Sequence, residues 1–221
     1  MIELQCPWPK QEQENVTPFE WPVSAEVKLV RPSETSENSF NAVLNNRQTR
    51  RVFSLLNKDE VGELFYLSNR TLWRDSNSSG LTIEHRPVVS AGGLHAVECL
   101  VLSPDDDAWY RYDPFKHQLQ CLDISGLDAL ARSARAFFPT AGEATIIWYL
   151  GDMTRLSGKY QHPESLLWRD AGAMIATHSL VSEHLGYAFC PLGITGGEEA
   201  KTLSDKRVLV GLGLALVGGR D

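Results

Sequence analysis

The segment that most constrains the fold of this chain is residues 164–186, which read ESLLWRDAGAMIATHSLVSEHLG. Its small and apolar residues follow a helical period and run most of the way around the predicted helix. A helix that is apolar on nearly every side is unstable at a protein surface, because water would contact apolar side chains. We therefore expect this helix to lie at the centre of a core or of an interface between two subunits.

The segments around this helix predict an α+β fold. Further helices are expected at residues 37–46, from Asn57 onward, and at residues 123–138. Strands are expected late in residues 94–104, as a hairpin over residues 108–122, and at residues 143–152, 187–192 and 207–219. Because the hairpin interrupts any regular alternation of strands and helices, we expect a mostly antiparallel sheet flanked by helices.

Several segments are expected to lack regular structure. Residues 1–36 are rich in Pro, Glu, Ser and Trp, and we interpret them as an extended arm that could wrap a partner subunit, ahead of a single domain at residues 37–221. Residues 72–90 predict a polar loop, and residues 159–160 are expected in another. Residues 105–107, three aspartates, predict a solvated turn and not a metal site.

Charge and cysteine content argue against several classes of function. The formal net charge is −7, which disfavours binding to nucleic acid or to an anionic membrane. No apolar run approaches the roughly 18 residues that span a bilayer, and the first residues do not resemble a secretory signal. The four cysteines are scattered and are not spaced for zinc. We expect a cytoplasmic protein with reduced thiols and no metal.

A basic cluster stands out in this acidic chain. Residues 47–53 read RQTRRVF, with three arginines and a threonine in seven positions. Guanidinium groups bind phosphate through paired, charge-assisted hydrogen bonds. The cluster therefore indicates a site for a small anion, and the alternative is that these arginines are solvated on an exposed turn.

The glycine-bearing segments contain no complete nucleotide-binding fingerprint. The run at residues 211–219 has no helix after it, and Gly158-Lys159 lacks the other residues of a phosphate-binding loop. The turn SAGG at residues 90–93 has backbone N–H groups that an anion or a flat ring can approach, although a plain tight turn would have the same sequence. A second such turn, PLGITGG, occupies residues 191–197.

Four segments occur in order along residues 37–218: RQTRRVF at 47–53, RPVVSAGGLHAVE at 86–98, WYRYDPFKHQL at 109–119 and GKYQHPESLLWRDAGA at 158–173. The first is similar to R-[basic]-S-x-R-x-[FY], the leading motif of the nitroreductase-like flavoproteins, with Gln48 and Thr49 in its second and third positions. The other three resemble the azoline-forming dehydrogenases of the SagB type within that family.

That resemblance implies a nitroreductase-like fold in an intertwined homodimer, with FMN bound between the two subunits. The first motif would hold the phosphate and ribityl chain, the SAGG turn would line the flavin, and the PLG turn would present N–H groups near the redox edge of the ring. His95 would lie near the flavin or cap a helix. The implied cofactor-binding residues are Arg47, Gln48, Thr49, Arg51, Ser90, Ala91, Gly92, His95, Leu192 and Gly193.

Several positions depart from the family pattern. Val89 and Ala96 replace prolines of the subgroup, and Asp170 replaces a glutamate. Gln48 removes one positive charge, which predicts weaker FMN binding. The family often ends in a further basic residue for the phosphate; only Arg220 is available here, and it is not assigned.

Lys159 and Tyr160 are the candidate catalytic residues. In the azoline dehydrogenases such a pair is tied to activity, as a base that removes a proton while hydride passes to the flavin. A lysine acts in this way near neutral pH only where burial or nearby cations lower its pKa. Adjacent Lys and Tyr residues also occur by chance in polar loops. His178, on the long helix, is expected to be a core or interface histidine.

The implied function is an FMN-dependent oxidoreductase of a biosynthetic pathway, acting on a carbon–nitrogen bond of a peptide-derived or related small molecule. One alternative is an NAD(P)H-dependent reductase of nitro compounds or quinones, in which electrons flow in the other direction. Another is a non-catalytic member that supports a biosynthetic complex with a partner protein. Neither nucleic acid nor a membrane is an expected partner.

Overall fold

The computed structural model describes residues 5–33, 39–106 and 108–220. Among these residues the helices are α1 (Phe40–Asn46), α2 (Lys58–Asn69), α3 (Asp128–Arg135), α4 (Met153–Lys159), α5 (Glu164–Leu185) and α6 (Gly197–Thr202), with single 3₁₀ turns η1 (Ala91–Gly93) and η2 (Ala141–Glu143). The strands are β1 (Trp8–Pro9), β2 (Val23–Lys28), β3 (Trp73–Ser76), β4 (Thr82–His85), β5 (Val97–Leu102), β6 (Trp109–Asp113), β7 (Gln118–Leu122), β8 (Thr145–Asp152), β9 (Tyr160–Gln161), β10 (Tyr187–Leu192) and β11 (Leu209–Gly219).

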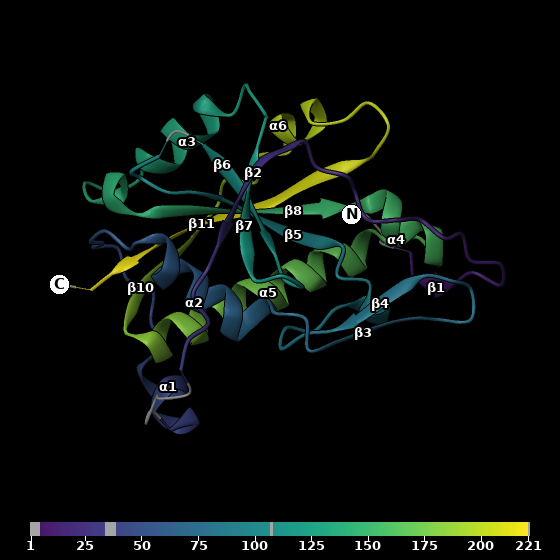
Figure 1. Ribbon diagram of the computed structural model, residues 1–221, viewed down its shortest axis with the longest axis horizontal. Helices are drawn as coiled ribbons and strands as arrows, with labels where there is room; N and C mark the ends of the chain where they lie inside the picture. Colours follow the sequence, from purple (N-terminus) through teal and green to yellow (C-terminus); the bar gives the residue numbers. More distant parts are fainter. Residues whose placement is uncertain (1–4, 34–38, 107, 221) are drawn as a thin grey trace.

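A seven-stranded sheet forms the centre of the molecule (Figure 1). Its strand order is β10-β11-β8-β5-β6-β7-β2, and all neighbouring strands are antiparallel. Figure 1 shows α5 and α2 on one side of the sheet and α3 and α6 on the other. The prediction of an α+β fold, with a mostly antiparallel sheet flanked by helices, is confirmed.

The interior strand β8 is buried at all eight positions. Its side chains alternate between two apolar layers, because successive residues of a strand point to opposite faces of the sheet. One layer combines Ile147 with residues of α2 and α5 such as Phe65 and Met174. The other combines Trp148 with residues of α3 such as Leu130. Burial on both faces explains why the β8 sequence is almost continuously apolar.

The predicted long helix and the predicted helix start at Asn57 are both present. The Asn57 side chain accepts hydrogen bonds from the N–H groups of Asp59 and Glu60, and the Glu60 carboxylate accepts from Asn57 N–H at 2.7 Å. This reciprocal arrangement is a capping box. The helix predicted at residues 37–46 appears as α1, with Ser39 as its N-cap; residues 37 and 38 lie outside the described part of the chain.

The prediction of a loop over residues 72–90 is wrong in part, because β3 and β4 form a hairpin. Every residue of β3 is exposed, so no alternation of apolar residues marks the strand in the sequence. The Asn77 side chain accepts from Leu81 N–H at 2.9 Å and closes the turn. The short helices α4 and α6 are likewise not predicted. Lys159 therefore ends a helix and Tyr160 begins a strand, where the sequence suggested a polar loop.

The described part of the N-terminal arm lies along its own chain. Strand β2 pairs with β7 at the edge of the sheet. Trp21 Nε1 donates to the Glu98 carboxylate at 2.6 Å, and the Phe19 and Trp21 rings pack edge to face with centroids 4.8 Å apart. Both rings contact the second apolar layer. These two aromatic rings of the arm thus pack on the same subunit; residues 1–4 and 34–36 of the predicted arm are not described.

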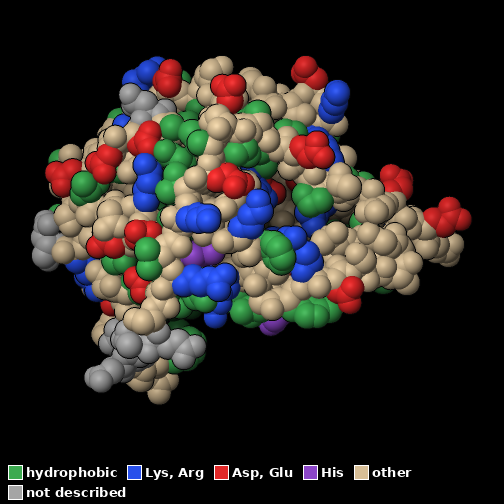
Figure 2. All heavy atoms as spheres, viewed as in Figure 1, with side chains coloured by type: hydrophobic (Ala, Val, Ile, Leu, Met, Phe, Trp, Pro, Cys, Tyr) green, Lys and Arg blue, Asp and Glu red, His purple; other side chains and the backbone are tan. Residues whose placement is uncertain are grey.

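Basic side chains gather near the centre of the face shown in Figure 2, although the chain carries a net charge of −7. Many of the basic groups of the sheet are paired with carboxylates, as in Lys116 with Glu26 at 3.3 Å and Arg111 with Glu98 at 2.6 Å. Paired charges leave little positive potential for a polyanion. Across the described ranges, no helix combines the length and the apolar character that crossing a membrane requires.

Candidate functional site

The SAGG turn and the Lys159-Tyr160 pair are distant in sequence and meet in the structure. Lys159 Nζ donates to the backbone carbonyl of Gly92 at 3.2 Å. Gly92 has φ 60°, and a Cβ atom built there would lie 2.5 Å from both Lys159 Nζ and Tyr160 Oη. Only glycine suits both the conformation and the close approach. The turn cluster is defined here as Ser90, Ala91, Gly92, Lys159, Tyr160 and Asp170.

Asp170 of α5 fixes the conformation of the turn. Its carboxylate accepts from the Ser90 hydroxyl at 2.7 Å and from Ala91 N–H at 2.9 and 3.1 Å. The Ser90 hydroxyl oxygen in turn accepts from His95 N–H at 2.9 Å. These bonds tie the turn to α5 on one side and to the start of β5 on the other, so the backbone of the turn is held in one arrangement.

Burial changes the acid–base properties of this cluster. It lowers the pKa of the Lys159 amine. Burial, together with the nearby Asp170 carboxylate, raises the pKa of Tyr160. Burial also raises the pKa of Asp170, against the opposing effect of the Ala91 N–H and Ser90 hydroxyl donors. The direction of these changes brings Lys159 closer to the range of a useful base and keeps the Tyr160 phenol protonated near neutral pH.

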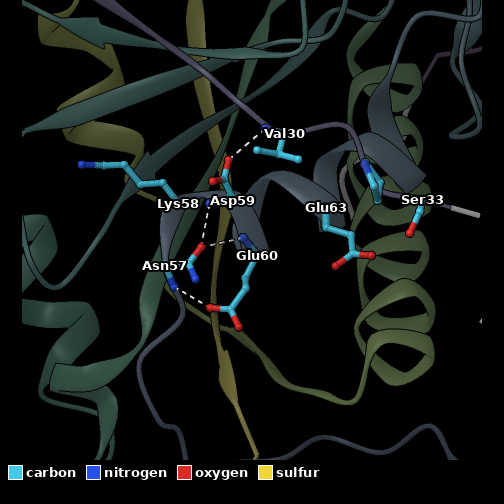
Figure 3. A pocket seen from close by; sticks show the side chains of 8 residues that line it. Val30, Ser33, Asn57, Lys58, Asp59, Glu60 and Glu63 are labelled. Atoms are coloured by element: carbon cyan, nitrogen blue, oxygen red, sulfur yellow. Dashed lines mark hydrogen bonds between the residues drawn. The ribbon is translucent and has the colours of Figure 1, made fainter. Parts of the chain in front are cut away.

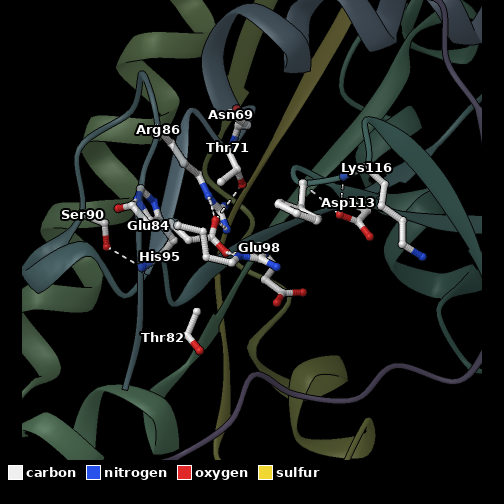
Figure 4. Close-up of polar contacts among 12 residues, drawn as sticks. Asn69, Thr71, Thr82, Glu84, Arg86, Ser90, His95, Glu98, Asp113 and Lys116 are labelled. Carbon is white, nitrogen blue, oxygen red and sulfur yellow. Dashed lines mark hydrogen bonds and ion pairs between the residues drawn. The ribbon is translucent and has the colours of Figure 1, made fainter. Parts of the chain in front are cut away.

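His95 follows the turn, and its side chain is buried, with 4% exposed. Its Nε2 donates to the Glu84 carbonyl oxygen at 3.1 Å. Figure 4 shows His95 beside Glu84 and Arg86. The buried Glu84 carboxylate pairs with Arg86 at 2.7 Å and with Arg74 at 2.5 Å. Burial, reinforced by the Arg86 charge, lowers the pKa of His95 to about 3, so the ring is neutral. His95 thus connects the turn to the β3–β4 hairpin.

A second cluster lies beside the basic segment, at the C-terminal end of α5. A pocket of about 410 Å³ opens between the ends of α1, α5 and β11. It is lined by Asn45, Asn46, Arg47, Gln48, Arg50, Glu183 and Arg220, and is termed the arginine pocket. Three arginines and one carboxylate give it a formal charge of +2. A phosphate monoester carries about −1.5 to −2 at neutral pH, so the charges are complementary.

Glu183 of α5 holds two of these arginines. Its carboxylate accepts a hydrogen bond from Arg220 and lies 3.5 Å from Arg50 Nη2, and its side chain is only 8% exposed. Arg50 N–H donates to the Phe189 carbonyl at 3.1 Å, and Arg220 Nε donates to the Tyr187 carbonyl at 2.9 Å. Arg50 and Arg220 are therefore both hydrogen-bonded to β10, and these bonds hold the positive groups of the pocket together.

Two predicted residues of the basic segment do not line this pocket. Thr49 is half-buried between two residues that do. The Arg51 guanidinium lies 5.7 Å from the centroid of the Phe138 ring, and the Arg51 carbonyl accepts from Thr140 Oγ1 at 3.2 Å. Arg51 is exposed, and its guanidinium contacts the Phe138 ring instead of the pocket.

The predicted residues of the PLG turn lie between the two clusters. Leu192 ends β10 opposite Leu214, and Gly193 is exposed, with open space where a side chain would be. The neighbouring Gly213 faces Ile175 in the middle of α5. Asp170 and Glu183, which belong to the two clusters, are about 20 Å apart along α5. In one subunit, then, the predicted residues are distributed along a helix and do not converge at one point.

Three solved structures have the architecture described above. A nitroreductase-like protein from Ralstonia eutropha JMP134 gives a TM-score of 0.68 at 18% identity, over 95% of this chain and 98% of its own. A chain of the E. coli microcin synthetase McbBCD complex, with truncated pro-MccB17 bound, gives a TM-score of 0.57 at 19% identity. The match covers 86% of this chain and 77% of that one. A nitroreductase-like protein from Desulfovibrio desulfuricans, in complex with FMN, gives a TM-score of 0.53 at 15% identity. The match covers 84% of this chain and 91% of that one. The chain has the nitroreductase fold.

The nitroreductase fold expected from the sequence motifs is therefore confirmed. No protein-family model matches the sequence, and no curated protein matches it. The low identities mean that the likeness is carried by the arrangement of the elements. The motifs quoted above remain the basis for any finer assignment within the fold.

Four residues of the two clusters are not among the site residues predicted from the sequence: Arg50, Asp170, Glu183 and Arg220. Asp170 and Glu183 are carboxylates in a largely apolar helix, which is the sequence feature that marks them. Arg50 belongs to the basic segment and Arg220 is the last basic residue of the chain, but neither feature indicates which arginines will meet. Their grouping follows from the pairing of β10 with β11.

His178 is a core histidine, as predicted. Its side chain is fully buried, Nδ1 is 2.8 Å from the Tyr149 hydroxyl, and Nε2 is 2.6 Å from Asn69 Oδ1. Burial lowers its pKa to about 3. A neutral ring with both nitrogens bonded satisfies the polar groups inside this layer and is not available to a ligand.

Another pocket, of about 490 Å³, lies over the start of α2 (Figure 3). Its charged lining residues are Lys58, Asp59, Glu60 and Glu63. Asp59 accepts from Val30 N–H at 2.9 Å, and Glu60 belongs to the capping box. Three carboxylates around one lysine disfavour an anion, and the polar contacts of this pocket serve the helix cap. It is not a candidate for binding phosphate.

Proposed function

We propose that this chain is an FMN-dependent oxidoreductase. The observation that carries the proposal is the placement of two complementary clusters along α5. At one end, the arginine pocket has the charge for a phosphate group. At the other end, Gly92 has no side chain, so Lys159 and Tyr160 approach the backbone of the turn directly. The residues present therefore fit a phosphorylated flavin, and the D. desulfuricans structure in complex with FMN supports this choice.

The proposed site is completed by a second copy of the chain. The two clusters lie about 20 Å apart along α5, and the outer side of this helix carries exposed Gly172 and Ala176. A two-fold axis that packs α5 against α5 of another copy, in the opposite direction, would bring the arginine pocket of each copy beside the turn cluster of the other. A homodimer of this kind has two equal sites between its subunits.

Bound FMN would supply the hydride chemistry. The residues of the chain then bind the cofactor, orient the substrate and move a proton. Lys159, whose pKa is lowered by burial, is the group that takes a proton from the substrate, and Tyr160, whose pKa is raised, stays protonated and donates a hydrogen bond. Backbone N–H groups of Leu192 and Gly193 would stabilise negative charge at the edge of the ring.

The finer proposal is a dehydrogenase of the SagB type, acting on a carbon–nitrogen bond of a peptide-derived or related small molecule. The contact of Lys159 with Gly92 supports it, because this contact joins two of the motifs that resemble the subgroup. The E. coli microcin synthetase complex, solved with truncated pro-MccB17, contains a chain of this fold. It supports a peptide-derived substrate and a biosynthetic partner protein.

An absorbance spectrum of the purified protein, followed by heat release and identification of the chromophore, tests the cofactor. We expect the visible bands of oxidised flavin at about one FMN per chain, because each copy contributes one half to each site. Anaerobic bleaching by an azoline-containing peptide would indicate the dehydrogenase, and bleaching by NAD(P)H the alternative reductase. A colourless protein that takes up no added FMN would contradict the proposal and favour the non-catalytic partner.

The double change Arg47→Ala and Arg51→Ala tests the phosphate assignment. Removing two guanidinium groups should abolish flavin retention while the mass in solution stays that of the wild type, because both side chains are exposed. The matched control is Arg132→Ala with Lys201→Ala, two exposed basic residues on α3 and α6. Equal flavin content in the two double variants would refute the assignment.

The change Lys159→Ala tests the base. The variant should keep its flavin and lose turnover by at least roughly 100-fold, the usual contribution of a general base. Flavin content and turnover are measured on the same preparation, so loss of cofactor is distinguished from loss of chemistry. Turnover equal to that of the wild type would leave Lys159 with a structural role only.

A further inference from the structure

The N-terminal arm pairs directly with the segment that carries the candidate catalytic residues. Strand β1 is antiparallel to β9, with Trp8 opposite Gln161 and Pro9 opposite Tyr160. Figure 1 shows β1 beside the end of α4, away from the seven-stranded sheet. The backbone of Tyr160 is thus held by a part of the chain that lies some 150 residues earlier in the sequence.

Two further backbone hydrogen bonds extend this pairing into α4. Lys10 N–H donates to the Lys159 carbonyl at 2.8 Å, and Glu14 N–H donates to the Gly158 carbonyl at 2.9 Å. Carbonyl groups at the end of a helix lack partners within the helix. The arm supplies those partners, and each residue from Gly158 to Tyr160 is held by the backbone of residues 9–14.

Gly158 shows how closely the arm approaches. A Cβ atom at this position would lie 2.7 Å from Val16 Cγ2 and 2.9 Å from the Glu14 carbonyl oxygen. Both distances are shorter than van der Waals contact, and the second atom belongs to the backbone and cannot rotate away. Gly158 is helical and has no positive φ, so its backbone accepts alanine and the obstacle is the arm itself.

Other residues of the arm make hydrogen bonds to other parts of the chain. Asn77 Nδ2, in the turn of the β3–β4 hairpin, donates to Gln13 Oε1 at 3.1 Å. Arg207 Nη2, just before β11, donates to the Thr17 carbonyl at 2.8 Å. Together with the Trp21 bond to β5 described above, these contacts hold the arm in place along three separate elements. The Lys159 segment is therefore clamped between the arm and the SAGG turn.

We propose that residues 8–16 position Lys159 and Tyr160 for proton transfer, acting through the backbone of residues 158–160. Lys10 and Glu14 are positioning residues, because their amides fix the end of α4 from which the Lys159 side chain reaches the Gly92 carbonyl. Burial lowers the pKa of the Lys159 amine, and we expect displacement of the arm to change that burial. This inference rests on the proposed function, in which Lys159 is the base.

The change Gly158→Ala tests the inference, because it forces the arm off the end of α4. The main readout needs no cofactor: the rate at which the Lys159 amine reacts with an acylating reagent is followed against pH by peptide mass spectrometry. We expect the midpoint of this profile to move upward, toward that of an ordinary lysine, and turnover to fall roughly tenfold with flavin content unchanged. Gly142→Ala, at an exposed glycine with open space around it, is the control.

A chain that begins at Gln11 provides a second variant, because it lacks β1 and the Lys10 amide and keeps the remaining anchors. Trp8 is 65% exposed, and none of the described residues 5–10 belongs to the core. This truncation should shift the acylation profile in the same direction. Wild-type profiles in both variants, or shifted profiles without loss of turnover, would overturn the inference. If the wild-type protein instead holds no flavin, the proposed function fails, and the acylation profile still decides whether the arm positions Lys159.

Discussion

Glu183 is the residue whose charge most affects the arginine pocket. It is a buried carboxylate between Arg50 and Arg220, and it lowers the formal charge of the pocket from +3 to +2. The carboxylate orients both guanidinium groups and also repels an incoming phosphate. Its net effect on binding is the difference between these two contributions, which a substitution that keeps the shape of the side chain can separate.

At this residue scale, Glu183→Gln should tighten binding of FMN relative to riboflavin, which lacks the phosphate. The amide oxygen can still accept from Arg220, while the repulsion of the phosphate is removed. We expect a gain of roughly tenfold in affinity for FMN, equivalent to about 1.4 kcal/mol, and little change for riboflavin. Titration of the flavin-free protein with both flavins measures this. Equal changes for the two flavins would show that Glu183 acts only through the shape of the site.

At the scale of elements, the β3–β4 hairpin depends on one buried carboxylate. Glu84 of β4 accepts from Thr71 at 2.8 Å, pairs with Arg74 of β3 and pairs with Arg86 beyond β4. Strand β3 is exposed along its whole length, so the apolar burial of the hairpin comes from Leu81 and Ile83. This ionic network also contacts His95 and so supports the conformation of the SAGG turn.

This network predicts how stability depends on pH. Burial alone would raise the pKa of Glu84, but Arg86, Thr71 and Arg74 outweigh it and lower the pKa from 4.5 to about 2. The stabilisation is therefore complete above the unfolded-state pKa and is lost as pH falls from about 4.5 toward 2. The loss should amount to about 3 kcal/mol.

Urea unfolding at several pH values between neutrality and about 2 measures this dependence. The control is Glu84→Gln, which cannot ionise. It should be less stable than the wild type at neutral pH, and its stability should fall less steeply with acid. Parallel curves for the two proteins would mean that other carboxylates cause the acid sensitivity.

For the whole molecule, α5 has two roles that the fold combines. Its inner side packs Leu167, Ala171 and Met174 against the sheet. Its outer side carries small exposed residues between the two clusters, and this is the surface along which we propose that two copies pack. Because each cluster holds half of the predicted site, assembly and flavin binding should depend on each other.

Ala176→Arg on the outer side of α5 should therefore separate the subunits and remove the flavin together. A long charged side chain cannot be accommodated between two closely packed helices, whereas it leaves the core of one subunit intact, because Ala176 is exposed there. Sedimentation gives the mass and absorbance gives the flavin content. Ala129→Arg, at an exposed position of α3, is the matched control. A dimeric Ala176→Arg variant that retains its flavin would contradict this arrangement.

Elements whose residues form a local pattern can be predicted from the sequence. The apolar period of α5, the continuous apolar run of β8, the turn of the β6–β7 hairpin and the capping residues of α2 all act between neighbours in the chain, so they can be identified without the fold. The SAGG turn and the basic segment were found in the same way, because small residues and clustered arginines have chemical meaning wherever they lie.

Which of these segments contact one another depends on the folded chain as a whole. Nothing near Gly92 in the sequence indicates that it will contact Lys159, and nothing near Arg220 indicates that Glu183 will join it to Arg50. The β3–β4 hairpin and the pairing of the arm with β9 were missed for the same reason, since exposed or two-residue strands have no apolar period. Such contacts are fixed by packing between distant segments, and their energy appears only when the whole sheet has formed.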